Sequence, residues 1–342
     1  MTISLDTIPS LTAAEARGIA AGEFGVAGQA APLPSERDQN FLITDARGGK
    51  YVLKIANVSD APDLLEFQNQ AMRHVVKAAT DCRVPRVVRS RQGLDLATIR
   101  NSRTGTDHWV RLLTWIDGEV LAKCRARGPV LFESIGVSLA KIDAALSDFR
   151  HPAMHRILQW DLRRADMARE NLGVLPAARR THVERVFLQW ERIDWTALPH
   201  SVIHGDMNDY NVIVVGGRMA GLLDFGDMLY TATVCDLAVA LAYTMLDERE
   251  PLEVAAQVTR AYQRVHALTD AEQRALFPLV LSRLCMSVCY SAHNRARNPN
   301  DPYQVVTEAA AWDLLDRLEL CSAGEALAAI RAACAAPSAD FQ

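Results

Sequence analysis

The chain has 342 residues, of which 49% are hydrophobic and 23% are charged, a composition typical of globular proteins. This length allows two lobes that each bury a substantial core. The formal net charge of −4 argues against the basic surface expected of a nucleic-acid-binding protein.

Cysteine usage and hydropathy predict a protein of the reduced cytoplasm. The seven cysteines are scattered and include no CxxC pair, so we expect neither disulfides nor a thiolate metal site. The first ten residues lack the charged-then-apolar pattern of a signal sequence. The longest apolar runs, 234–246 and 275–292, contain Asp236 and Arg283, so we predict no membrane span.

The first part of the chain is predicted to form a small antiparallel sheet accompanied by helix. Residues 11–24 are expected to be helical, with Thr12 as the N-cap and Glu15 at the capping-box position. Glycines and prolines then interrupt the pattern up to residue 34. The elements predicted after this break are strands at 41–44 and 51–55 around a Gly-Gly turn, a helix at 64–80, and strands at 84–90 and 109–114 with a polar hairpin tip at 100–107.

After a predicted hinge at residues 115–118 the pattern becomes mostly helical. The predicted helices are 132–146, 156–171, 177–193, 233–246, 252–268, 270–294, 303–322 and 324–335. The chain is therefore expected to divide into an N-terminal lobe at 1–114 and a larger helical lobe at 119–342. The predicted fold class is α+β.

The most informative stretch is residues 201–230, SVIHGDMNDYNVIVVGGRMAGLLDFGDMLY. Two short apolar strands, 212–215 and 219–223, are joined by a two-residue Gly-Gly turn. The hairpin therefore places the polar segment 204–211 beside the acidic segment 224–227.

The polar residues of this hairpin are the types that phosphoryl transfer requires. Asp206 is the candidate base, because an acceptor hydroxyl needs a carboxylate within hydrogen-bond reach. Asn211 and Asp224 are the candidate magnesium ligands, since Mg²⁺ prefers hard oxygen ligands. A polar loop with incidental acids is the alternative, and the combined spacing of HGD, asparagine and DFG disfavours it.

HGD followed by DFGD resembles the aminoglycoside phosphotransferase and choline kinase superfamily, whereas protein kinases carry arginine at the position of Gly205. The segments HGDMNDYNVIV, GLLDFGDM and VCDLAVALAYTM look most like the hydroxylysine kinase group. By motif order the resemblance extends from about residue 32 to residue 318. It implies a two-lobed, protein-kinase-like fold with a nucleotide-binding N-terminal lobe and a helical C-terminal lobe that carries the catalytic loop and the acceptor site.

Lys54 is the candidate phosphate-binding lysine of the N-terminal lobe. It lies on an alternating strand that precedes a helix bearing acids, the order in which such a lysine pairs with a helix glutamate. Glu66 is therefore its expected partner, and Asp63 is a local competitor. A solvated strand lysine is the alternative interpretation.

The resemblance points to residues 34–40 as the loop that covers the phosphates, because no GxGxxG motif precedes Lys54. The candidate phosphate donors in this loop are Ser35, Arg37 and Asn40. The hinge strand 112–116, which includes Leu113, is expected to present backbone groups to a purine. Trp115 would line the same pocket or pack in the core.

The acceptor site is expected beside Asp206, among the helices of the C-terminal lobe. Asp209 and Asp227 are the nearest additional acids in the sequence and are candidates for binding a substrate ammonium group, and Asp227 for a second metal ion. Arg295 or Arg297, after a long apolar helix, is the candidate partner of a substrate carboxylate. Cations also favour a helix C-terminus without binding any ligand, which is the alternative for both arginines.

The sequence therefore predicts a Mg²⁺-dependent small-molecule kinase that uses ATP or GTP. The resemblance implies 5-hydroxylysine, or a related hydroxy amino acid or amino alcohol, as acceptor, and associates this group with GTP. Homoserine, choline, ethanolamine and aminoglycosides are alternative acceptors. We expect a cytoplasmic monomer or homodimer without nucleic-acid or membrane partners.

Two other classes of protein are disfavoured by particular residues. A protein kinase would not have Gly205 in place of arginine and would carry an APE motif after Asp224. A catalytically silent nucleotide-binding regulator is disfavoured because the chemistry-bearing positions are intact. These positions are Lys54, Asp206, Asn211 and Asp224.

Overall fold

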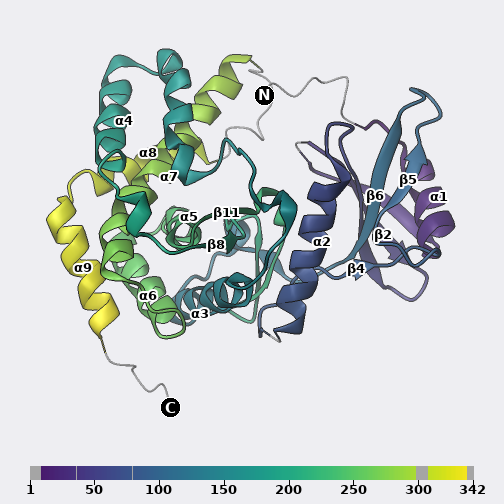
Figure 1. The fold of residues 1–342 in the computed structure, drawn as a ribbon, viewed down its shortest axis with the longest axis horizontal. Coiled ribbons are helices and arrows are strands. Elements are labelled where there is room, and N and C mark those ends of the chain that lie inside the picture. Colours follow the sequence, from purple (N-terminus) through teal and green to yellow (C-terminus); the bar gives the residue numbers. More distant parts are fainter. Residues whose placement is uncertain (1–8, 36, 79, 298–306, 337–342) are drawn as a thin grey trace. The chain divides into compact units, whose positions relative to one another are not determined.

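The computed structural model describes residues 9–35, 37–78, 80–297 and 307–336, which form two compact units (Figure 1). The main division falls between Asp117 and Gly118, within the segment predicted as a hinge. Two short pieces depart from a single linear boundary. Thr80–Cys82 groups with the second unit, and His151–Ala153 groups with the first.

Within its described residues the first unit contains one antiparallel sheet and two α-helices. Its strands are β1 (Gly28–Leu33), β2 (Gln39–Asp45), β3 (Lys50–Ile55), β4 (Val87–Val88), β5 (Ala97–Arg100) and β6 (Asp107–Thr114). They are ordered β1-β2-β3-β6-β4, and β5 pairs with β6. The helices are α1 (Ala13–Phe24) and α2 (Pro62–Lys77).

The N-terminal helix α1 begins as its sequence predicts. Thr12 is the N-cap, its hydroxyl accepts from the backbone N–H of Glu15, and the Glu15 carboxylate accepts from the backbone N–H of Thr12. Gly25 ends the helix in the left-handed conformation, with φ of 71°. Small residues of α1 pack against alternate residues of the sheet to form this unit's core. The core includes Ala16, Ala20, Phe41, Ile43, Leu53, Ile55, Val110 and Leu112.

Two strands of the first unit were not predicted. Strand β1 contains Gly28 and Pro32, which we interpreted as breaks in the pattern. A proline is tolerated there because β1 is an edge strand, paired only with β2 among the described strands. Strand β5 forms the hairpin with β6, and the segment predicted as a strand at 84–90 is reduced to the two residues of β4.

The second unit is built mainly from helices (Figure 1). They are α3 (Pro129–Leu146), α4 (Ala177–Trp190), α5 (Val234–Thr244), α6 (Pro251–Gln263), α7 (Asp270–Arg297), α8 (Glu308–Leu318) and α9 (Ala323–Ala335). Helix α3 packs against α6, where the backbone of Val258 lies so close to Gly136 that a Cβ would not fit. Glycine at this position therefore allows the two helices to approach closely.

Helix α7 is the central helix of this unit. By length and composition it could cross a membrane, but 94% of its most apolar window is buried inside the protein, as in a core helix. It packs against α4, α5, α8 and α9, and against the 3₁₀ segment η4 (Leu162–Val174). The helix predicted at 156–171 is confirmed only in part, because the chain is helical from residue 162 and forms the 3₁₀ segment η4, with a kink at Arg164.

Three short strand pairings complete the second unit. Strands β9 (Val212–Val215) and β10 (Arg218–Leu222) form the predicted hairpin, and β7 (Glu119–Val120) pairs with β9. Strand β8 (His200–Ile203) pairs with β11 (Leu229–Ala232). Gly216 and Gly217 have φ of 58° and 73°, the two left-handed positions that such a turn requires. The helix predicted at 303–322 corresponds to α8, and its first four residues lie outside the described residues.

A fully buried carboxyl group lies between helices α3 and α6. Asp143 Oδ2 accepts a 2.6 Å hydrogen bond from the Tyr262 hydroxyl. Burial and the neighbouring Asp236 carboxylate raise the pKa of Asp143 well above its usual value. No donor among the described residues reaches Asp143 Oδ1, and the Asp236 side chain lies close to the same carboxyl group, which fits a protonated, neutral Asp143.

This buried group predicts a specific pH dependence of stability. Because folded Asp143 holds a proton that the unfolded chain releases above about pH 4, unfolding releases one proton. The free energy of unfolding therefore falls by about 1.4 kcal/mol per pH unit from this group alone. Asp143→Asn should remove that contribution. Urea unfolding at pH 5, 6 and 7 should show the variant gaining stability relative to wild type, and a constant difference would contradict a neutral Asp143.

Candidate active site

The polar loop between β8 and β9 is fixed through its backbone. The carboxylate of Asp236, fully buried at the start of α5, accepts from the backbone N–H groups of His204 and Gly205, both at 2.9 Å. His204 Nδ1 accepts from the Asp206 N–H, and Nε2 lies 2.9 Å from the Leu223 carbonyl oxygen. This pattern assigns the ring proton to Nε2 and ties the loop to the end of β10.

Gly205 occupies a position that only glycine fits. Its φ is 79°, and a Cβ added there would lie 2.7 Å from the backbone carbonyl oxygen of Asp227. A side chain would therefore meet both a strained conformation and immovable backbone. Glycine at this point brings the loop bearing Asp206 against the loop bearing Asp227.

Asp206 is held by three side chains. Its Oδ2 accepts from the amides of Asn208 at 2.9 Å and Asn211 at 2.8 Å, and its Oδ1 accepts from Arg283 at 2.9 Å. The side chain is 20% exposed. Burial raises the pKa of Asp206 to about 8, although the Arg283 guanidinium lowers it. The carboxylates of Asp227 and Asp224 also raise this pKa.

Asn211 and Asp224 have the chemistry of a divalent-cation site. The Asn211 amide nitrogen donates to both the backbone and the side chain of Asp206, so its amide oxygen is directed elsewhere. Asp224 has a left-handed backbone with φ of 51°, and its Oδ1 accepts from the Gly226 N–H at 3.1 Å. Hard oxygen ligands of this kind suit Mg²⁺ or Ca²⁺.

The charges around Asp206 also favour a bound cation. Asp224 and Asp227 lie close enough to Asp206 to raise its pKa, and Arg283 is the cation that opposes them. Three carboxylates and one guanidinium leave an excess of two negative charges when all are ionised. A divalent cation would neutralise that excess.

Arg283 is the residue of this site that the motifs did not identify. It lies 77 positions after Asp206 on α7, and only 2% of its side chain is exposed. The sequence contained a signal for it, because an arginine inside an apolar helix must find a compensating carboxylate. In the sequence analysis above, Arg283 is evidence only against a membrane span.

The predicted acceptor-binding acid Asp209 and the predicted carboxylate-binding arginines have different surroundings in the structure. Asp209 is buried, with 6% of its surface exposed, and its Oδ1 has no hydrogen-bond partner within the described residues. Burial raises the pKa of Asp209 to about 6. Arg295 forms an ion pair with the buried Glu308 of α8. Arg297 is exposed at the end of α7. The structure therefore places Arg283, not Arg295, beside Asp206.

Lys54 lies on β3 in the first unit, and its neighbours differ from the expected ones. Its side chain is mostly buried and lies 3.7 Å from the Asp38 carboxylate. Glu66, the partner that we predicted, accepts a hydrogen bond from Gln70 one turn further along α2. The expected Lys54–Glu66 pair is thus replaced by a Lys54–Asp38 pair, because Asp38 directly precedes the strand that pairs with β3.

Two of the three predicted phosphate donors, Ser35 and Arg37, lie in the loop before β2, and the third, Asn40, lies on β2 itself. Ser35 is exposed, and Arg37 donates to Asp60 at 3.4 Å. Asn40 is paired in register with Lys54 across β2 and β3, which places both side chains on one face of the sheet. Residue 36 of this loop lies outside the described residues.

The predicted purine-binding strand is β6 and its continuation. Leu113 is buried and pairs in register with Val52 and Val87. The backbone N–H of Trp115 donates to the Lys50 carbonyl, and its indole N–H donates to Asp117. The Trp115 backbone N–H is thus engaged within the first unit, and the purine contact expected of residues 112–116 stays a prediction.

Comparison with known proteins identifies the family. The model of the phosphotransferase enzyme family matches residues 29–277. The chain belongs to this family. Hydroxylysine kinase of Mus musculus is 32% identical over 342 aligned residues, which cover 91% of this chain and 90% of the relative. Together with the family match, this similarity makes the protein a small-molecule kinase.

Two solved structures share the fold of this kinase. A microcompartment-associated aminopropanol kinase has a TM-score of 0.72 at 17% identity and covers 92% of this chain and 99% of its own. An amicoumacin kinase in complex with AMP-PNP, Ca²⁺ and Ami has a TM-score of 0.68 at 14% identity, and the match covers 89% of this chain and 93% of that one. The protein-kinase-like fold expected from the hairpin motifs is confirmed.

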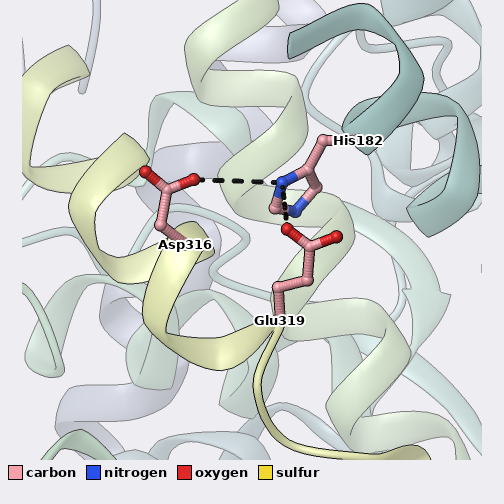
Figure 2. Close-up of side chains that lie close together, drawn as sticks. All are labelled: His182, Asp316 and Glu319. Carbon is pink, nitrogen blue, oxygen red and sulfur yellow. Dashed lines mark ion pairs between the residues drawn. The ribbon is translucent and has the colours of Figure 1, made fainter. Parts of the chain in front are cut away.

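A group of charged side chains on α4 and at the end of α8 lies close together in this kinase (Figure 2). His182 of α4 lies with its Nδ1 3.0 Å from Glu319 and 4.0 Å from Asp316. Arg179 already pairs with Asp316, and Arg185 pairs with Glu319. Two guanidinium groups would repel a dication, so we interpret the group as an ion-pair network that joins α4 to α8.

The Lys54–Asp38 pair can be tested by a double-mutant cycle on nucleotide affinity. Because the two side chains are mostly buried, Lys54→Met and Asp38→Asn should be coupled by about 1 kcal/mol. Glu66→Gln, the matched control, should be additive with Lys54→Met within about 0.5 kcal/mol. Titration of a fluorescent nucleotide into each variant measures both couplings. Coupling to Glu66 but not to Asp38 would show that Lys54 exchanges partners when nucleotide binds.

Proposed function

We propose that this kinase transfers the γ-phosphoryl group of ATP or GTP to the side-chain hydroxyl of 5-hydroxylysine or a closely related hydroxylated amino acid. The observation that carries the proposal is the similarity to a hydroxylysine kinase along nine-tenths of both chains. The contacts around Asp206 support the chemistry that this reaction needs.

Asp206 would orient the acceptor hydroxyl and receive its proton. A carboxylate oxygen accepts about two hydrogen bonds. Oδ2 already accepts two, from Asn208 and Asn211, while Oδ1 accepts one, from Arg283. The hydroxyl would therefore donate to Oδ1. A raised pKa brings the carboxylate closer to the pKa that suits a general base near neutral pH.

Asn211 and Asp224 would hold Mg²⁺, supported by their oxygen chemistry and by the excess negative charge around them. A metal ion held there would supply positive charge that offsets the negative charge developing on the phosphoryl group during transfer. Lys54 would bind phosphate oxygens from the first unit, and Asp38 would orient its ammonium group. Catalysis would then consist mainly of positioning and charge neutralisation.

Asp209 is the best supported receptor for the substrate ammonium group. It follows Asp206 by three residues, and both carboxylates lie close enough to Tyr243 to raise the pKa of its phenol. A buried carboxylate oxygen without a partner is costly, and an ammonium group would provide the missing donor. Asp227, close to Asp206 in the other loop, is the second candidate.

Two substitutions test the assigned chemistry. Asp206→Asn should keep the fold and nucleotide affinity while turnover falls by about 10²–10⁴, because a lost general base costs this much. Asp224→Asn should abolish metal-dependent turnover at every Mg²⁺ concentration, because a principal metal ligand is lost. Asp313→Asn, an exposed acid on α8, is the matched control and should leave turnover unchanged. Turnover within threefold of wild type in Asp206→Asn would remove Asp206 from this role.

The acceptor can be identified by competition. Hydroxylysine, its decarboxylated analogue, homoserine, choline and kanamycin should be compared, each with ATP and with GTP. We expect hydroxylysine to exceed choline and kanamycin in kcat/KM by about tenfold or more, which requires only about 1.4 kcal/mol of differential binding. Asp209→Asn should reduce this preference, since the ammonium partner is lost. If choline or kanamycin is the better substrate, the hydroxylysine assignment is wrong.

A further inference from the structure

The guanidinium of Arg283 is enclosed within the second unit. It donates to Asp206 Oδ1 at 2.9 Å and to the Trp160 carbonyl at 3.3 Å. The rings of Trp160 and Tyr243 lie 4.5 and 5.4 Å from its central carbon. Two aromatic faces and two hydrogen bonds thus define where the guanidinium lies.

Such an environment is costly unless the charge is compensated. An arginine side chain stays protonated even when buried, so α7 carries a permanent positive charge into an apolar interior. The Asp206 carboxylate forms a 2.9 Å ion pair with it, Asp227 also acts on it electrostatically, and the aromatic faces add cation–π attraction. The position of the guanidinium is therefore coupled to that of the Asp206 carboxylate.

The hydrogen bonds also fix the rotation of that carboxylate. The two amides hold Oδ2 from within the catalytic loop, and Arg283 holds Oδ1 from a separate helix. Without Arg283, both remaining contacts would fall on one oxygen, and the carboxylate could rotate about its side-chain bond. Arg283 is 2% exposed, so it acts through Asp206 and not on the substrate.

We propose that Arg283 is a positioning residue that holds the Asp206 carboxylate with one acceptor site of Oδ1 directed to the substrate hydroxyl. This proposal rests on the role of Asp206 given above. Loss of the positioning contact should lower turnover and leave substrate affinity nearly unchanged, because misplacing a catalytic group by about 1 Å costs about 10²-fold. A purely structural role would instead lower stability and affect all parameters alike.

The test compares Arg283→Met with Arg283→Lys. The methionine variant should lose about 10²-fold in kcat, with KM for both substrates within about threefold of wild type. The lysine variant keeps the buried charge and one contact to Asp206, so it should recover about tenfold of that loss. It also tests the proposal if the methionine variant does not fold. Arg274→Met, on the same helix but exposed and paired with Asp270, is the control and should keep wild-type turnover.

A double mutant separates this inference from the function on which it rests. In the Asp206→Asn background, Arg283→Met should lower single-turnover phosphate transfer by less than about threefold, because the two residues act as one unit. Multiplicative losses, or wild-type kcat in folded Arg283→Met, would overturn the positioning role. Wild-type turnover in Asp206→Asn would instead overturn the proposed function. Circular dichroism and nucleotide binding confirm that each variant is folded.

Discussion

The buried carboxylate of Asp236 is the contact on which the catalytic loop depends. It accepts from two successive backbone N–H groups, those of His204 and Gly205, in a region without water access. A buried carboxylate needs such donors, and the loop needs an acceptor for amides that no strand partner satisfies. The His204 ring then joins the loop to the residue that follows β10, because its Nε2 lies 2.9 Å from the Leu223 carbonyl oxygen. One helix terminus thereby positions both the loop that carries Asp206 and the segment that precedes Asp224.

That arrangement forces acids together and requires a cation to balance them. Because Gly205 lets the two loops touch, Asp206 lies near Asp224 and Asp227, and each raises the cost of ionising it. Arg283 compensates part of this charge permanently, whereas a divalent metal ion would do so only when nucleotide and metal are present. The charge balance of the site would thus depend on its occupancy, which links ionisation of Asp206 to assembly of the reactive complex.

Sequence reasoning succeeded where short-range spacing determines geometry. The Thr12 cap, the Gly-Gly hairpin turn and the proximity of Asp206 to Asn211 all follow from residues a few positions apart. It failed where contacts join distant positions: Arg283 reaches Asp206 across 77 residues, and Lys54 pairs with Asp38, not with Glu66. Strand β1 was missed for a related reason, because only its place at the sheet edge makes a proline acceptable there.

The rigid hold on Asp206 has a consequence for substrate choice. The Asp206 carboxylate accepts hydrogen bonds from Arg283, Asn208 and Asn211, so these side chains contribute little to recognising the rest of the acceptor. Arg295 is likewise committed to Glu308. Asp209 differs, since it is buried and its Oδ1 has no hydrogen-bond partner within the described residues, although Arg127 lies close enough to lower its pKa. An acceptor that carries an ammonium group would supply a donor to that oxygen, whereas a neutral alcohol would bring no positive charge.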